Sequence, residues 1–563
     1  MNRHLSNFFA DGPGLPGWLV VVVMVVLGAG CSSQHYRKSA DKEAYRAIQD
    51  KAPRVPNMDS NFTIETNALV LWEDLPKITE VDPALGEIGS MEVGTHILSL
   101  AKALEIAVKN SRDYQNSKEN LYLSALSLTL ARYQYTPIFS AGASPRYSGE
   151  LTKNVDTLTD THQLQANPNA GVKMLLNSGM KLATALNADF FRFIKGGDPR
   201  LMADSSIAST LSQPLLRGAG YRVTMENLTQ AERNLLYDMR TFVQFRKSFT
   251  VDVVSQFYNV IRSKEQARNE WNRAKSFRQT AERTRALYGE GLAKRADVGR
   301  LEQEEISTDI SLTDALVSYQ RNLDNFKITL GIPLDAPIVL DDGELKKLRI
   351  DHPDFNTTNA VRVALVSRLD LYNVRDQFED AARKIDIAKN QLLPDLTLVL
   401  DASASAPRGR GLPELDLQNA NWSAGFDVNL PLDRKSERNS YRASLVNYER
   451  ARRKLELAVD QIKLEVNDNW RSLETAKRNY DSSVIGVRIN QERVDEQNLL
   501  AEYGRATTID QVDAQNALTA SLNAQTSALV NHTISRLKFW RDLGILTIKD
   551  NGLWEEVNNI STP

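Results

Sequence analysis

An uninterrupted helical stretch from Glu437 to Tyr503 restricts the possible folds of this chain more than any other feature. It holds no proline and one glycine, and Ala, Leu, Glu, Lys, Gln and Arg, which favour helix, dominate it. Apolar or small residues recur every seven positions in two rows offset by three or four, as in a coiled-coil seam. The rows are Tyr441, Tyr448, Leu455, Ile462 and Ala476, and Val459, Val466, Leu473, Tyr480, Val487 and Val494. At 1.5 Å per residue, the stretch predicts a rod of roughly 100 Å that needs another rod as its partner.

A second stretch of this kind runs from Thr224 to Tyr288 and contains neither proline nor glycine. Its seven-residue row is Leu228, Leu235, Phe242 and Phe249. We expect the two rods to pair with each other. A glycine-containing turn and another helical run follow each rod, so the pair Tyr288-Gly289 recurs as Tyr503-Gly504. Two such units in one chain indicate an internal repeat.

Two shorter helices and a strand region precede each rod. The helices are predicted at 98–110 and 112–135 in the first unit, and at 360–371 and 372–392 in the second. Strands with one apolar face are predicted at 172–176, 180–190, 396–404 and 422–430, with weaker candidates at 138–146 and 205–213. The polar segment 152–169 is predicted to be an exposed loop. The first strand region is about forty residues longer than the second, because insertions collect in loops rather than in rods.

Composition and motifs argue against an enzyme and against a nucleic-acid-binding protein. The chain has 563 residues and a formal net charge of −2, so there is no excess of basic residues for nucleic acid. Its six histidines are scattered, and HExxH, CxxC, GxSxG and phosphate-loop motifs are absent from the sequence. We therefore predict no catalytic residue, no metal and no cofactor.

The only cysteine, Cys31, follows an apolar run of about ten residues from Trp18 to Leu27. Such a run is too short to cross a bilayer and has the length of a signal-peptide core. The small residues before Cys31 resemble the bacterial lipobox, in which the cysteine is acylated and becomes the mature N-terminus. Leu27 lies four residues before the cysteine, whereas the usual pattern has leucine three before, so an ordinary cleaved signal stays an alternative. Ser32 in place of an aspartate favours the outer membrane over the inner one.

The two strands of the second unit are about ten residues long and have one apolar face, as in outer-membrane strands. A hairpin packed on a water-soluble core would show the same pattern. A sheet in lipid must close on itself, and about eight strands is the usual minimum for a barrel. This chain offers four clear strands, or six if the hairpin at 172–190 is included. Several chains must therefore contribute strands to one barrel, which the rods would continue as a helical tube.

The repeated order of elements resembles that of the TolC family of outer-membrane efflux and secretion channels, over about residues 98–546. Short motifs carry the resemblance together with that order: Ala103-Leu104 and Ala364-Leu365, the Gln-Leu-Leu-Pro-Asp stretch at 391–395, Asp297-Val298, and Leu330-Gly331-Ile332-Pro333. The resemblance implies a homotrimer with a twelve-stranded transmembrane β-barrel and a long periplasmic α-helical barrel. It also implies a periplasmic adaptor and an inner-membrane transporter or ATPase as partners. Four strands per chain fit that barrel, and whether the hairpin at 172–190 adds to it stays open.

On this basis the fold class is mainly α with a small β part, built from a duplicated helix–strand–long-helix repeat. The predicted regions are a signal peptide (1–30), a lipid-anchored extended arm (31–91), the first efflux repeat (92–333), a linker (334–356), the second efflux repeat (357–546) and a C-terminal tail (547–563).

The resemblance also implies an acidic ring at the periplasmic entrance of the tube. In the family, two aspartates spaced by three follow the second turn, and Asp510 and Asp513 match that spacing after Gly504. Asp297 matches the equivalent position after Gly291. Aspartates in the first turn of a helix are also favoured by the helix dipole, which is the structural alternative for Asp297 and Asp510. The family arginine that locks the entrance is replaced by Ala506, with Arg505 beside it.

The turns at Gly291, Leu292 and Gly504 match the tips that contact the adaptor in the family. Their alternative role is to cap helix C-termini with positive φ angles. The functional hypothesis is a passive outer-membrane channel of a tripartite efflux or type I secretion system. A lipid-anchored coiled-coil scaffold without a pore is the alternative, and it leaves the alternating strands unexplained.

Overall fold

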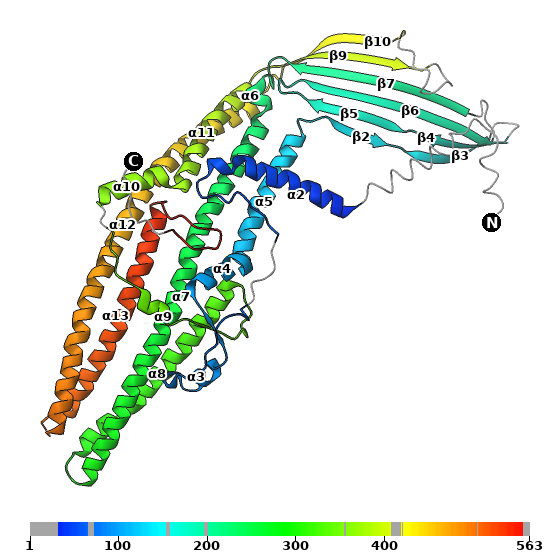
Figure 1. Cartoon of the computed structure of the whole chain (residues 1–563). Helices are drawn as coiled ribbons and strands as arrows, with labels where there is room; N and C mark the ends of the chain where they lie inside the picture. Colours follow the sequence, from blue (N-terminus) through cyan, green and yellow to red (C-terminus); the bar gives the residue numbers. More distant parts are fainter. Residues whose placement is uncertain are drawn as a thin grey trace, which may run out of the picture.

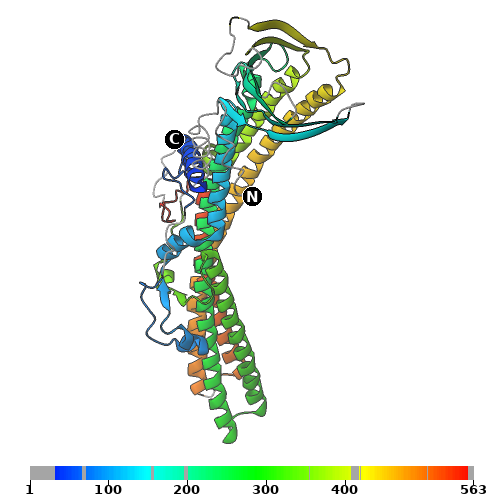
Figure 2. The same cartoon turned by 90° about the vertical axis from the view of Figure 1, so that its right-hand side faces the viewer.

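The computed structural model describes residues 32–65, 72–153, 158–195, 201–353, 356–406, 418, 420–503 and 505–555. The described chain is an elongated helical body with a broad antiparallel sheet at one end (Figures 1 and 2). Two helical hairpins run away from the sheet and end in short turns. No described helix combines the length and hydropathy that crossing a bilayer requires.

The helices follow the predicted repeated order. The first unit comprises α4 (Leu100–Asn110), α5 (Arg112–Tyr133), the short α6 (Tyr221–Thr224), the rod α7 (Glu226–Gly289) and α8 (Arg295–Leu330). The second comprises α10 (Thr357–Ser367), α11 (Leu369–Asn390), the rod α12 (Lys435–Glu502) and α13 (Thr508–Asp542). Both rods are single continuous helices, as the absence of proline in them predicts.

The expectation that the two rods pair with each other is wrong. The main partner of α7 is α8 and the main partner of α12 is α13, so each rod forms an antiparallel hairpin with the next helix. Helix α13 also packs against α7 and joins the two hairpins. All five residues of α12 that are buried belong to the predicted heptad rows: Ile462, Val466, Leu473, Ala476 and Val494. A heptad row reports that a helix has a packed face but does not say which helix covers it.

The main core surrounds α7, which buries four phenylalanines and five valines along its length. The Tyr114 ring of α5 lies between Phe242 and Phe249, with ring centroids 6.1 and 5.3 Å away. The segment 31–91, predicted as an extended arm, instead contains helix α2 (Ser33–Lys51), which crosses α5 (Figure 1). This helix buries Ala44, Ala47 and Ile48, a narrow face of small residues that carries little hydrophobic signal.

The segment 334–356, predicted as a linker, is also structured. Strand β8 (Ile338–Leu340) pairs in parallel with β1 (His96–Leu98), and the short helix α9 (Gly343–Lys347) follows. Nearby, α3 (Glu87–Glu92) is fixed to α7 by Lys264, whose Nζ lies 3.1 Å from the Glu92 carboxylate. The Tyr319 hydroxyl of α8 donates a 2.5 Å hydrogen bond to the same carboxylate. We call α3, β1, β8 and α9, which lie against the middle of the first hairpin, the collar.

In the part of the chain that the structure describes, the large sheet contains eight strands. They are β2 (Ile138–Gly142), β3 (Pro145–Lys153), β4 (Leu158–Ala166), β5 (Asn169–Leu175), β6 (Lys181–Lys195), β7 (Leu201–Pro214), β9 (Asp395–Ser405) and β10 (Asn421–Asn429). All pairings are antiparallel, in the order β10-β9-β7-β6-β4-β3, and β5 pairs with both β6 and β2. The strands predicted at 172–176, 180–190, 205–213, 396–404 and 422–430 are confirmed. The prediction of a loop at 152–169 is wrong, because half of this segment is strand β4.

Candidate functional site

The large sheet has one apolar face and one polar face. Directly opposite residues in an antiparallel sheet lie on the same face, so the strand register defines both faces. One row on the apolar face is Leu182, Leu211, Leu400 and Ala424, taken from β6, β7, β9 and β10. Trp422 and Phe426 of β10 lie on this face and are 80% and 65% exposed. An apolar face exposed on a whole sheet needs a covering, and lipid or another protein surface can supply it.

The opposite face carries hydroxyl, amide and carboxylate groups. The neighbouring row on this face is Ala183, Thr210, Asp401 and Ser423. The Asp401 carboxylate accepts a 2.7 Å hydrogen bond from Thr210 and a 3.4 Å hydrogen bond from Ser423, so the strands are also joined through side chains. This face is suited to water. The sheet can therefore separate an apolar phase from an aqueous one.

The turn between α7 and α8 is a tight cap. Gly291 has a φ angle of +74°, and the Leu292 amide donates a 2.8 Å hydrogen bond to the Leu287 carbonyl. This geometry satisfies the last carbonyls of α7 and requires a residue without a Cβ at Gly291. Leu292 is 76% exposed at the tip. The capping role of Gly291 is thus confirmed, and an apolar side chain is left at the extreme end of the hairpin.

Helix α13 begins at the second turn with a reciprocal cap. The Thr507 hydroxyl accepts a hydrogen bond from the Asp510 amide at 3.2 Å and donates one to the Asp510 carboxylate at 2.6 Å. Asp510 therefore stabilises the helix end, as its structural alternative predicts. Asp513 is exposed one turn later, and no hydrogen bond or ion pair holds it among the described residues. Gly504 and Cys31 lie outside the described residues.

The structure brings the beginnings of α8 and α13 to the same level. Val512 packs with Leu301 and with two residues of α7, Phe277 and Ala281, in a small buried cluster. Asp513 lies next to Val512 in α13, and Asp297 lies one turn before Leu301 in α8. Asp297 is half-buried, whereas Asp510 and Asp513 are exposed. The three predicted carboxylates thus gather near one end of the molecule.

Other acidic residues of α8 are neutralised by α7. Arg285 lies 2.6 Å from Glu305, and Arg278 lies 3.1 Å from Asp309. Ala506 is half-buried, and the Arg505 side chain beside it is exposed. Among the described residues no ion pair joins Arg505 to the aspartates.

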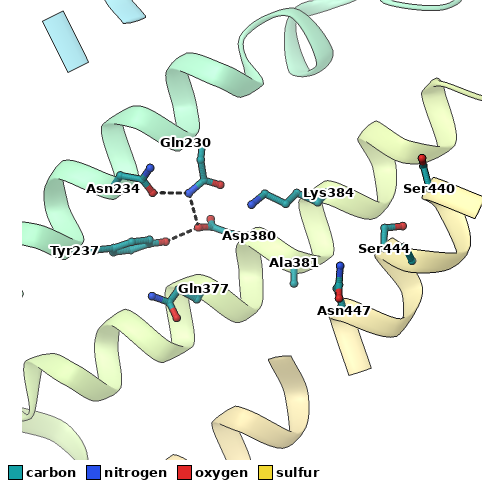
Figure 3. A pocket seen from close by; sticks show the side chains of 11 residues that line it. Gln230, Asn234, Tyr237, Gln377, Asp380, Ala381, Lys384, Ser440, Ser444 and Asn447 are labelled. Atoms are coloured by element: carbon teal, nitrogen blue, oxygen red, sulfur yellow. Dashed lines mark hydrogen bonds between the residues drawn. The ribbon is translucent and has the colours of Figure 1, made fainter. Parts of the chain in front are cut away.

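A polar cavity of about 530 Å³ lies where α7, α11 and α12 approach the sheet (Figure 3). Its centre is Asp380 of α11, which accepts hydrogen bonds from Tyr237 at 2.7 Å and Gln230 at 3.1 Å. Arg233 and Arg383 contact the same carboxylate at 2.7 and 2.9 Å. Burial, and then the hydrogen bond to Asp380, raise the pKa of Tyr237 to about 12. Asp380 joins the two repeats, because it lies on α11 and contacts residues of α7. Its carboxylate oxygens already have hydrogen-bond and ion-pair partners, so Asp380 is not available to a ligand.

Two histidines of the described residues lie together in the helical body. His532 of α13 is fully buried, with its ring centroid 5.9 Å from that of His352. Burial, and then the neighbouring His352, lower the pKa of His532 to about 4, so it is neutral at physiological pH. Within the described ranges, no group of three or more His, Cys, Asp or Glu residues is placed to hold a metal ion.

Sequence reasoning missed several residues that shape these surfaces. Strand β4 was hidden because Thr161, His162 and Gln163 are polar on both faces and show no alternation. The contacts of Asp380 with Tyr237 and of Glu92 with Lys264 could not be predicted, because these partners lie more than 140 residues away along the chain. A pairing at that separation leaves no local sequence pattern.

Comparison with solved structures identifies the fold. The chain is similar to the outer-membrane protein VceC of Vibrio cholerae, with a TM-score of 0.57, 16% identity, and coverage of 79% of this chain and 96% of that one. It is similar to the CmeC outer-membrane channel of Campylobacter jejuni, with a TM-score of 0.56, 12% identity, and coverage of 89% and 94%. A third match is the MtrE outer-membrane channel of Neisseria gonorrhoeae in its open state, with a TM-score of 0.58, 16% identity, and coverage of 79% and 89%.

No family model matches the sequence. No curated protein matches it either. The structural matches extend over most of both chains in each pair. The chain therefore has the fold of outer-membrane channels, and the prediction of a mainly α chain with a smaller β part is confirmed, while the homotrimer and the closed barrel stay predictions.

Proposed function

We propose that this chain is one subunit of a TolC-type outer-membrane export channel, which conducts substrate passively from the periplasm to the exterior. The observation that carries the proposal is the sheet, whose exposed apolar face and polar face continue into two helical hairpins. The outer-membrane channels with the same fold support it. Conduction through a preformed tube requires neither a catalytic residue nor a cofactor, and we assign the chain no enzymatic activity.

Three copies form the working channel in this proposal. A sheet with free edges cannot face lipid, because its unpaired backbone groups would have no hydrogen-bond partner there. Most of α12 is also exposed in one chain, although its heptad rows are suited to packing. Leu457 and Leu464, which lie outside those rows, are also 56% and 58% exposed. Neighbouring copies in a homotrimer would cover both the sheet edges and this helix.

The periplasmic aperture lies at the tips of the hairpins. Three copies would place three Asp513 carboxylates around one narrow opening, where they repel one another and attract cations. Asp510 stabilises the start of α13 and adds its charge to the same ring. Asp297 contributes from the first hairpin. This ring favours cations at rest and opens when the hairpins separate.

The hairpin tips are the contact sites for a periplasmic adaptor, which connects the channel to an inner-membrane transporter or ATPase. The exposed side chains of Leu292, Tyr288 and Tyr503 support an apolar contact at these tips. Gly291 allows the tight turn that presents Leu292, and Gly504 is the proposed adaptor contact of the second hairpin. Substrate selection belongs to the pump, because nothing in the described channel wall is specific for one chemical class.

The chain is placed in the outer membrane of a Gram-negative bacterium, with Cys31 as its acylated mature N-terminus after removal of residues 1–30. Helix α2 begins two residues after Cys31 and packs against α5, so the lipid would be held close to the sheet end of the molecule. Mass spectrometry of the mature N-terminal peptide tests the acylation. An unmodified Cys31 thiol would contradict it.

Planar-bilayer conductance tests the channel itself. The purified protein is expected to produce stepwise currents, whereas a coiled-coil scaffold without a pore would carry none. Replacing Asp510 and Asp513 together with alanine is expected to raise the resting conductance and to weaken block by multivalent cations. Asp481→Ala, an exposed aspartate higher on α12, is the matched control and should change neither quantity. Unchanged currents in the Asp510 and Asp513 double variant would refute the aperture.

A further inference from the structure

The strand region of the first repeat contains two more sheet ribbons than that of the second repeat. Strands β2 and β3 are two parts of one ribbon, interrupted at 143–144, and β4 and β5 are two parts of the next, interrupted at 167–168. The evidence is their pairing: β2 pairs with β5, β3 pairs with β4, and β6 pairs with β5 along one half and with β4 along the other. With β6, β7, β9 and β10, six ribbons lie side by side (Figure 1).

In their β2 and β5 parts, which join the helices, the two extra ribbons have the same faces as the rest of the sheet, whereas β4 is polar on both faces around Thr161, His162 and Gln163. On the apolar face, the row through β2, β5, β6, β7, β9 and β10 is Phe139, Val172, Thr184, Ser209, Ala402 and Trp422. On the polar face, the next row is Ile138, Lys173, Ala183, Thr210, Asp401 and Ser423. Phe139 at one edge is 78% exposed and Trp422 at the other is 80% exposed. A surface elaboration would not need to continue an apolar row in register.

The register of the rows also shifts in one direction across the sheet, as the strand tilt of a closed barrel requires. The polar row starts at Ile138, the first residue of β2, and ends at Ser423, six residues from the end of β10 at Asn429. Six residues rise by about 20 Å along a strand, and five strand spacings cover about 24 Å, which gives a tilt of about 40°. Strands of membrane barrels tilt by about 35–45°. The extra ribbons continue this register shift.

The two edges of the sheet are complementary. The chain leaves the helices along β2 and returns to them along β10, so the two edge strands run in opposite directions. When β10 of one copy lies beside β2 of a second copy, the antiparallel alternation continues. Val428 at the end of β10 and Phe139 at the start of β2 then lie on the same apolar face, at the level where both strands join the helices. The partner that fits each edge is therefore the opposite edge of another copy of this chain.

From this geometry we infer that the channel closes as an eighteen-stranded barrel, with six strands from each of three copies, in place of the twelve strands that the family resemblance implies. The number of copies rests on the proposed function. The diameter of a barrel grows in proportion to its strand number, so this one is about 1.5 times as wide as a twelve-stranded barrel. Its cross-section is about twice as large. Such an exit passes bulkier substrates, and the hairpin at 172–190 is part of its wall.

Disulfide cross-linking in the intact membrane tests which strand closes the barrel. Asp427→Cys on β10 is combined in turn with cysteine at Ile138, Ser140 or Gly142, the polar-face positions of β2. These positions lie about 20 Å or more from Asp427 within one copy, too far for an internal disulfide. The matched scan combines Asp427→Cys with cysteine at Lys181, Ala183 or Ala185 on β6, the edge that a twelve-stranded barrel would use. Ala208→Cys with Ser403→Cys, opposite each other within one chain, controls for oxidation, and single variants control for bonds to Cys31.

Covalent dimers and trimers from the β2 scan alone support the eighteen-stranded barrel. Covalent oligomers from the β6 scan would overturn it and leave the proposed channel intact. If neither scan gives oligomers while the control bond forms and the protein conducts, the inference also fails. If the protein neither conducts nor forms oligomers, the proposed function fails with it.

Discussion

Replacing Asp380 with alanine is expected to loosen the junction between the two repeats near the sheet. The Asp380 side chain is 5% exposed and neutralises Arg233 of α7 and Arg383 of α11, whose side chains are 25% and 23% exposed. Removing one partner of a buried ion pair costs roughly 3–5 kcal/mol. Because both arginines can reach water, we expect a value near the lower limit, about 3 kcal/mol. That corresponds to a factor of about 150 in the equilibrium for local opening.

Hydrogen exchange measured on the native channel by mass spectrometry reads this local opening. The amides of α11 and of the first turns of α7 are expected to exchange about 100-fold faster in Asp380→Ala, while those of α8 and α13 stay unchanged. Glu379→Ala is the matched control, since Glu379 contacts the same Arg233 at 2.9 Å but is 65% exposed. A surface pair of this kind contributes at most about 1 kcal/mol. Equal exchange in the two variants would refute the assignment of Asp380 as the junction.

Three further predictions concern pH, backbone conformation and the collar. The pKa of His532 is lowered from 6.5 to about 4, so the histidine is protonated at a higher pH in the unfolded chain than in the folded one. Its contribution to the free energy of unfolding is therefore complete above about pH 6.5. This contribution is lost as the pH falls toward 4, by at most about 3 kcal/mol. Thermal unfolding of His532→Phe should show a smaller loss over that range, and an equal loss would contradict it. Gly331→Ala should cost at least about 2 kcal/mol, because φ is +76° and a Cβ would lie 2.1 Å from the Asn110 carbonyl oxygen. Gly291→Ala has a similar φ in open space, so its denaturation midpoint should fall less. Glu92→Ala leaves the buried Lys264 with only the more distant carboxylate of Asp342, 3.5 Å away, and should make α3 sensitive to limited proteolysis, whereas Glu87→Ala on the same helix should not.

The sequence predicted the rods and most strands because their signals are local. Proline-free runs with seven-residue rows define α7 and α12, and alternation defines β9 and β10. The same local reasoning could not reveal β4, where Thr161 to Gln163 are polar on both faces of the sheet. It also could not reveal α2, since Ala44 and Ala47 bury too little apolar surface to produce a marked period.

Contacts between distant segments were beyond the reach of sequence patterns. Heptad rows in α12 predicted a packed face, but the partner is α13 and not α7, because topology decides which helix is adjacent. In the same way, the spacing of Asp510 and Asp513 placed both on one side of α13. Only the structure separates their roles: Asp510 is bonded to Thr507, and Asp513 is exposed without a described partner.

Native mass spectrometry of the mature protein, extracted from membranes in detergent, tests most directly whether this chain is a segment of a closed wall. The account predicts a complex of three chains that dissociates or aggregates when detergent is removed, since the apolar face of the sheet would then meet water. A single chain that stays monomeric and dispersed in detergent-free buffer would contradict it.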